Sequence, residues 1–183
     1  MRKLIVAFVF SIVSITGLTA CSTSTNSSHM GMHSDEYDGS AVMFAQMMIP
    51  HHEQAVALSK LALDKSQNSE IIDLATRIKN AQSPEIKQME GWLESVGMPD
   101  MNHMMEMPGY VEKSKFARIK KLSGNEFDKM FLQLMIGHHK GAIEMAADIK
   151  NNSNSEVKAL SEAITSSQSA EIAEMQTLLE KLS

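Results

Sequence analysis

Cysteine is almost missing from this sequence, and aromatic residues are scarce. Only one of the 183 residues is a cysteine, Cys21, and aromatic side chains make up 5% of the chain. A single cysteine cannot form a disulfide within the chain, so a disulfide framework is excluded. Any soft metal ion held beyond that position must therefore be bound by thioether or imidazole rather than by thiolate.

Basic charge is also lacking, as are the motifs of several enzyme classes. The net charge is −5 and the sequence pI is about 5.8, so the basic face that nucleic-acid binding requires is not expected. The sequence contains no phosphate-binding glycine loop and no pattern of a nucleophilic triad. These absences argue against nucleic-acid partners, hydrolases and nucleotide-dependent enzymes.

The first 21 residues have the pattern of an export signal. Arg2 and Lys3 precede an apolar run, LIVAFVFSIVSITGL, and the segment ends in Thr19-Ala20-Cys21. It resembles the lipobox of bacterial lipoproteins, in which the cysteine is lipidated and anchors the protein to the cell envelope. The anchor could face the periplasm or lie in the outer membrane of a double-membrane bacterium. An uncleaved anchor helix is the alternative, because about 15 apolar residues approach a membrane span. The polar residues 22–34, which contain His29-Met30-Gly31-Met32-His33, are predicted to form a flexible tether.

A His-His pair occurs twice in matching surroundings. His51-His52 lies in FAQMMIPHHEQAVAL and His138-His139 in FLQLMIGHHKGAIEM, 87 residues apart (138 − 51). Downstream, IKNAQSPEIKQMEGWLE resembles ITSSQSAEIAEMQTLLE at an offset of 86 (168 − 82). This second offset pairs Gln82 with Gln168, Glu85 with Glu171 and Met89 with Met175. A repeat of this length indicates that one supersecondary unit was duplicated.

The repeated unit has the pattern of a helical hairpin. Four segments carry apolar residues at alternating spacings of three and four, as bundle helices do, and they run over residues 44–62, 71–93, 131–149 and 157–179. Asn/Ser-rich breaks at 66–69 and 151–155 would cap the second helix of each pair. The sequence therefore predicts an all-α domain over residues 35–183, a four-helix bundle of two hairpins (35–96 and 125–183) joined by a linker (97–124).

Two prolines and the linker modify this pattern. Pro50 and Pro84 remove backbone donors inside predicted helices, so kinks are expected at both. Alternatively, Ser83-Pro84-Glu85 starts a new helix. Within the linker, YVEKSKFARIKKL predicts a short cationic amphipathic helix, followed by a stop and restart at Ser123-Gly124.

The helical spacing divides the histidines into two inward and two flanking side chains. His51 and His138 lie in the apolar stripes, and His52 and His139 flank them, because neighbouring residues diverge by about 100°. Met48 and Met135 lie one turn before these rings. The further thioethers that helical spacing adds as candidate ligands are Met47, Met145, Met89 and Met175. The alternative is ordinary core packing, for which methionine is well suited. Gln82 and Gln168 would either donate to the histidine nitrogens or fix the helix register.

The linker holds a separate group of candidate ligands. The segment GMPDMNHMMEMPG lies between two Gly/Pro boundaries, and the chain has 16 methionines in all. Its candidate ligands are Met101, His103, Met104, Met105 and Met107. Thioethers combined with imidazole favour Cu(I), and by the same softness Ag(I). An adaptable contact surface and an oxidation target are the alternatives.

The doubled pattern F-x-x-x-M-I-x-H-H-x-x-A, then Q-x-x-E-I-x-x-M-x-x-W/L-L, resembles a bacterial family known as domain of unknown function 305. The resemblance spans about residues 36–182. It implies a ferritin-like four-helix bundle in exported or lipid-anchored proteins, some of which, of the CopM type, are periplasmic copper-binding resistance proteins. The family motif falls on Met48, His51, His52, Met89, Met135, His138, His139 and Met175.

Three functions remain open from the sequence. The first is a lipid-anchored envelope protein that binds copper, as Cu(I) or Cu(II), and silver as a further candidate, for sequestration, resistance or hand-over to envelope copper-transport proteins. The second is a ferritin-like metal oxidase, although that chemistry uses Glu-x-x-His pairs and no histidine here follows a glutamate by three residues. The third is an interaction module whose histidines have only a structural role.

Overall fold

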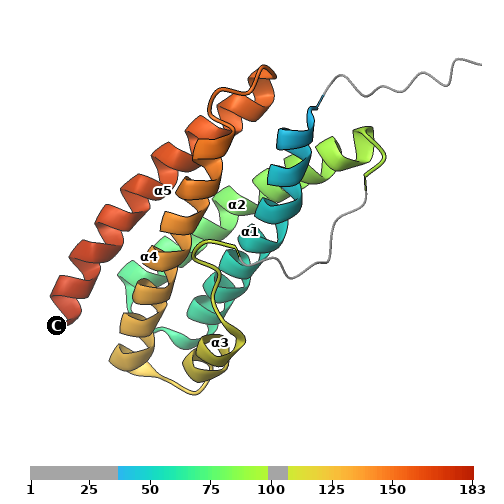
Figure 1. The fold of residues 1–183 in the computed structure, drawn as a ribbon. Helices are drawn as coiled ribbons and strands as arrows, with labels where there is room; N and C mark the ends of the chain where they lie inside the picture. Colours follow the sequence, from blue (N-terminus) through green and yellow to red (C-terminus); the bar gives the residue numbers. More distant parts are fainter. Residues whose placement is uncertain (1–36, 99–106) are drawn as a thin grey trace, which may run out of the picture. The chain divides into compact units, whose positions relative to one another are not determined.

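The computed structural model describes residues 37–98 and 107–183, and these residues form five helices (Figure 1). The helices are α1 (Gly39–Lys65), α2 (Ser69–Ser95), α3 (Lys113–Ile119), α4 (Gly124–Asp148) and α5 (Ser155–Leu182). The predicted all-α class is confirmed. Cys21, the tether and four of the linker candidates (Met101, His103, Met104 and Met105) lie outside the described residues.

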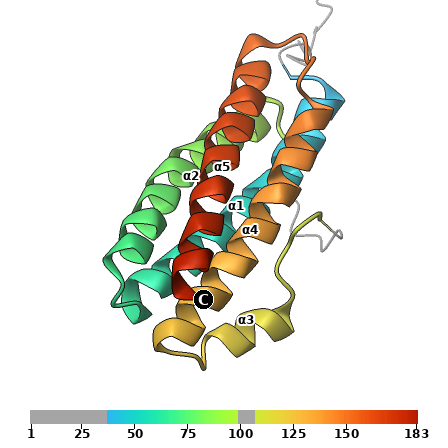
Figure 2. The ribbon, with the colours of Figure 1, turned by 90° about the vertical axis from the view of Figure 1, so that its left-hand side faces the viewer.

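The four long helices form two antiparallel hairpins, α1 with α2 and α4 with α5 (Figures 1 and 2). Polar residues in the short breaks start the second helix of each hairpin, as the sequence predicts. The Asn68 side chain accepts from the Glu70 N–H, and the Asn154 side chain accepts from the N–H groups of Glu156 and Val157. Each cap satisfies backbone donors that the first turn of a helix leaves without partners.

Two apolar clusters fill the interior of the bundle. The first cluster contains the start of α1, the end of α2, the end of α4 and the start of α5. The second cluster contains the opposite half of each of these helices. Buried polar residues lie between the two clusters along every long helix: His51 and His52, Gln82, His138 and His139, and Gln168. The bundle thus consists of two apolar halves separated by a polar layer.

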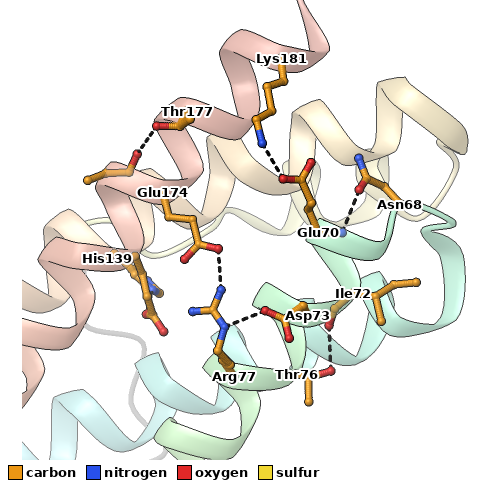
Figure 3. A network of polar contacts seen from close by, with 12 residues as sticks. Asn68, Glu70, Ile72, Asp73, Thr76, Arg77, His139, Glu174, Thr177 and Lys181 are labelled. Atoms are coloured by element: carbon orange, nitrogen blue, oxygen red, sulfur yellow. Dashed lines mark hydrogen bonds and ion pairs between the residues drawn. The ribbon is translucent and has the colours of Figure 1, made fainter.

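The hairpins meet mainly through α1 and α4, whereas α2 and α5 touch only locally. Two exposed ion pairs connect α2 to α5, Arg77 with Glu174 and Lys181 with Glu70 (Figure 3). Both pairs lie at the end of the bundle that contains the second cluster. Exposed ion pairs of this kind contribute at most about 1 kcal/mol each, so apolar packing dominates the association of the hairpins.

The helices run without interruption through both prolines. Pro50 lies inside α1 and Pro84 inside α2, so the prediction that a new helix begins at Ser83-Pro84-Glu85 is wrong. The second repeat has Gly137 and Ala170 at the corresponding positions. Burial of the helix on both sides of each proline outweighs the one backbone hydrogen bond that the proline removes.

The end of the linker lies directly on α1 and α4. We call residues 107–111 the strap. Gln54 of α1 holds the strap through two hydrogen bonds. Its Nε2 donates to the Val111 carbonyl at 2.9 Å, and its Oε1 accepts from the Val111 N–H at 2.6 Å. Beyond the strap the cationic helix α3 follows, as predicted, and Ser123 precedes the restart at α4. No helix within residues 37–98 or 107–183 is long and apolar enough to span a membrane.

Candidate metal centre

The four histidines of the polar layer have no exposed surface. His51 and His138 face each other across the α1–α4 contact, with ring centroids 3.7 Å apart and ring planes inclined by 33°. We call these the inner rings. His52 and His139, the outer rings, each point into their own hairpin, toward α2 and α5 respectively. The inner and flanking positions agree with the helical spacing, but the flanking rings are buried as completely as the inner ones.

The inner rings are neutral and anchored through Nε2. Loss of solvent, followed by the charge of neighbouring His52, lowers the pKa of His51 to about 3. Loss of solvent, followed by the charge of His51, holds the pKa of His138 well below its usual range. His51 Nε2 donates to the Pro108 carbonyl of the strap at 3.0 Å, and His138 Nε2 donates to the His51 carbonyl at 2.9 Å. The lone pair of each neutral ring therefore lies on Nδ1.

The outer rings are anchored by carboxylates. His52 Nε2 lies 2.8 Å from Glu85 Oε2, and His139 Nε2 lies 2.7 Å from Glu171 Oε2. A carboxylate can only accept in such a pair, so Nε2 is the donor. The two glutamates keep small exposed fractions, 17% for Glu85 and 12% for Glu171. They therefore reach from the edge of the hairpin toward the buried rings.

Nδ1 of all four rings is buried and has no hydrogen-bond partner among the described residues. A buried acceptor that stays unpaired costs about 1–3 kcal/mol, so four such atoms in one layer call for an explanation. Histidines that bind metal ions donate their other N–H to a carboxylate or a backbone carbonyl, which fixes the free nitrogen as the ligand. All four rings have this arrangement, and their donor set fits a metal ion.

Methionines complete two equivalent groups, one in each hairpin. The first group consists of Met48, His52, Glu85 and Met89. Met48 lies one turn before His52 on α1 and Met89 one turn after Glu85 on α2, and both are fully buried in the first cluster. Because α1 and α2 are antiparallel, this register places the two methionines on the same side of the His52–Glu85 contact.

The second group consists of Met135, His139, Glu171 and Met175. It repeats the same register between α4 and α5, and both its methionines are fully buried in the second cluster. We call these two sets the first and second Met/His groups. The methionines that the family pattern contains are therefore divided between two locations rather than gathered in one.

The other predicted ligands lie around the first group. Met145 is buried in the first cluster, and Met47 and Met107 pack against it while partly exposed. Among the described residues, no three His, Cys, Asp or Glu side chains come together in a way that could hold a metal ion. Metal binding at these rings would therefore depend on thioether sulfur.

Gln82 and Gln168 do not have the hydrogen bonds expected of them. Both are buried, yet neither amide oxygen has a partner among the described residues, and the Gln82 nitrogen has none either. Since every histidine Nδ1 is unpartnered as well, neither amide donates to a histidine. Glu85, Glu171 and two backbone carbonyls hold the rings instead.

Sequence reasoning missed these anchoring groups. Glu85 and Glu171 repeat at the same offset of 86 (171 − 85) as the glutamines and methionines, so a usable signal was present. The duplicated carboxylate was informative because it recurs at the same distance from a duplicated methionine. The Pro108 carbonyl carries no sequence signal, since any residue at that position supplies a carbonyl.

Comparison with known proteins agrees with this architecture. The profile of the family described as domain of unknown function 305 (DUF305) matches residues 41–179. The chain belongs to the DUF305 family. A candidate secreted DUF305 protein from Streptomyces coelicolor has a TM-score of 0.74 and 29% identity over 78% of this chain and 93% of its own. A DUF305 fragment from Deinococcus radiodurans has a TM-score of 0.74 and 30% identity over 79% and 97%.

Further similar structures contain metal ions. CopM in its Cu(I)-bound form is 31% identical to this chain, with a TM-score of 0.67 over 77% of this chain and 96% of its own. CopM structures with Cu(II) and with silver are similar to this chain to the same degree. A search of curated proteins finds no match. Metal binding is thus a property of CopM, a relative about 30% identical to this chain with a similar fold.

Proposed function

We propose that this protein binds Cu(I), and by the same chemistry Ag(I), at the two Met/His groups of its bundle. The observation that carries the proposal is the set of four buried imidazoles, each fixed through Nε2 and each with an unpartnered Nδ1. The copper and silver bound by the relative CopM support the choice of metal.

Each group would supply one imidazole nitrogen and two thioether sulfurs. Met48, His52 and Met89 form the first set of ligands, and Met135, His139 and Met175 form the second. Soft thioethers with one imidazole prefer Cu(I) to harder divalent ions. The inner rings, His51 and His138, add nitrogen donors between the two groups, and these favour Cu(II) when the metal is oxidised. The carboxylate of Glu85 or Glu171 would make its histidine a better donor.

The cellular role follows from this ligand set together with the N-terminal signal. With Cys21 lipidated, residues 35–183 would be held at the cell envelope by the tether of residues 22–34. A protein with buried soft ligands and a membrane anchor suits sequestration of copper or its hand-over to envelope copper-transport proteins. The methionines and the histidine of the linker, Met101 to Met107, would add capture ligands to those of the two Met/His groups.

An anaerobic Cu(I) titration of the purified protein against a competing chelator tests the proposal. We expect two tightly held ions per chain from the bundle sites, in addition to any ion held by the linker. The double variant Met48→Leu/Met89→Leu should lose one bundle ion, because Leu preserves the packing volume but has no sulfur. Met145→Leu, in the same cluster but outside both groups, is the matched control and should keep both. Binding only at millimolar Cu(I), or the retention of both ions by the double variant, would refute the proposal.

A further inference from the structure

The two Met/His groups are equivalent in ligands but not in their surroundings. On α1, Met43 and Met47 lie at intervals of one turn between the surface and His51, the inner ring next to the first group. Met43 is 58% exposed, Met47 is partly buried, and His51 is fully buried with its Nδ1 unpartnered. Residues four apart lie on one face of a helix, about 5–6 Å from each other. Met47 packs against the first cluster, which contains Met48 and Met89, the thioethers of the first group.

The second repeat lacks this path. At the offset of 87, Met43 corresponds to Met130 and Met47 to Leu134. Met130 is partly buried against the second cluster rather than exposed, and Leu134 has no sulfur. The series of sulfur atoms from solvent to His138 is therefore broken at its middle position.

The contact between α2 and α5 also differs between the two groups, because among the described residues it is held by ion pairs only beside the second group. Arg77 of α2 pairs with Glu174 of α5 (Figure 3). Glu174 directly precedes Met175 of the second group in the sequence. At the offset of 86, the first group has Gln88 and Ala163 at these positions, which cannot form an ion pair. Lys181 and Glu70 add a second link near the second group. Across the described residues, these are the ion pairs that join α2 to α5, and both lie at the end of the second cluster.

We propose that Met43 and Met47 form a transfer site for Cu(I) or Ag(I), so that the first group exchanges its ion readily and the second retains it. The inference rests on the proposed metal binding and assigns different roles to the two groups. An ion arriving at Met43 passes to Met47 and then to Met48 by ligand exchange. At each step one metal–sulfur bond forms while another breaks, and the metal keeps its oxidation state. The Arg77–Glu174 pair hinders the parting of α2 and α5 beside the second group.

The test is the rate at which the full chain takes up Ag(I) from a weak chelator, followed by stopped flow. For the wild type we expect a fast phase for one bundle ion and a slow phase for the other. Met43→Leu/Met47→Leu should slow the fast phase by at least about tenfold, without reducing the number of ions bound at equilibrium. Met130→Leu is the matched control, because it removes the corresponding thioether of the second repeat, and both phases should persist. Arg77→Gln should speed release of the slowly exchanging ion.

The possible outcomes are distinct. Unchanged rates in Met43→Leu/Met47→Leu, or equal slowing by Met130→Leu, would overturn the transfer site while leaving metal binding intact. A wild-type protein that takes up no Ag(I) against the chelator would overturn the proposed function itself. A loss of bound ions in the double variant would make Met43 and Met47 permanent ligands and would also contradict their role in transfer.

Discussion

At the scale of single residues, the polar layer is costly for the metal-free protein. Each buried Nδ1 without a partner costs about 1–3 kcal/mol, and the four rings share one layer. The Nε2 bonds to Glu85, Glu171 and two backbone carbonyls offset part of that cost and keep the rings from rotating. The rings are thus held ready for a ligand at the expense of stability.

The carboxylates of Glu85 and Glu171 should affect the affinity for the metal ion more than the stability of the fold. In Glu85→Gln the charge that makes His52 a better donor is lost while the shape of the side chain is kept. Changes of this kind to the partner of a metal-binding histidine weaken metal binding by about 10–100-fold. Chelator competition should show this loss for one ion in Glu85→Gln and for the other in Glu171→Gln. Glu90→Gln, an exposed change on α2, should leave both affinities unchanged.

The inner histidines should make the metal-free protein sensitive to acid. Their pKa values in the folded state lie below the usual 6.5, about 3 for His51 and well below 6.5 for His138, so unfolding takes up protons at low pH. The stability is therefore fully present above pH 6.5 and is lost as the pH falls from 6.5 toward 3. Urea midpoints measured with a chelator present should decrease across that range. A flat profile between pH 6.5 and 4 would show that these rings are not buried as neutral groups.

At the scale of elements, the strap is the part that depends most on close approach. Glycines allow it to lie against α4: a Cβ at Gly141 would fall 1.9 Å from the Pro108 oxygen, and one at Gly109 would fall 2.4 Å from the Gly137 oxygen. The same Pro108 carbonyl accepts from His51. The packing of the strap on α4 and the orientation of the His51 ring are therefore coupled.

Gly141→Ala should displace the strap and destabilise the protein. Forcing a methyl group into this contact costs about 1–3 kcal/mol, measurable as a lower urea midpoint at unchanged slope. Gly137→Ala, one turn earlier on α4, is the matched control, because a Cβ there meets nothing within 4 Å. It should stabilise the helix by up to about 1 kcal/mol. Equal shifts of the urea midpoint in the two variants would contradict the close packing of the strap against α4.

At the scale of the whole described domain, the proposed metal ligands connect elements that are distant in the sequence. Each Met/His group joins the two helices of one hairpin, and the inner rings join α1 to α4. An ion bound at these positions would cross-link the folded state but not the unfolded chain. Under the proposed function, metal binding and global stability would therefore be coupled.

Silver should raise the stability of the protein by mass action. At a free Ag(I) concentration 100 times the Kd, each occupied site adds about 2.7 kcal/mol to the free energy of unfolding. Thermal or urea unfolding with and without Ag(I) measures this, and Met48→Leu/Met89→Leu should show about half the gain. An unchanged midpoint under saturating Ag(I) would mean that the ion does not bind the folded bundle.

The sequence predicted the helices and hairpins well because their signals are local. Heptad spacing and Asn caps each depend on residues within a few turns, and the repeat shows that the same local pattern occurs twice. The anchoring of the rings depends instead on the rotation of α1 against α2 and on the path of the linker, which no local pattern fixes. For this reason Glu85, Glu171 and the Pro108 carbonyl hold the histidine rings, which is one of the two roles that the sequence predicts for Gln82 and Gln168. Whether Pro84 begins a helix or lies inside one likewise depends on the packing around α2 rather than on the helix propensity of proline.

The anchoring of the inner rings bears on the origin of the bundle. Two identical half-length chains, paired about a twofold axis between His51 and His138, would give each ring the same acceptor on its partner. In this protein His138 donates to the His51 carbonyl, but His51 donates to the strap. A symmetric homodimer cannot contain that difference. Because the two halves are joined in one chain, they can differ in sequence and contacts, and the strap takes the place that the His138 carbonyl would have in a symmetric dimer.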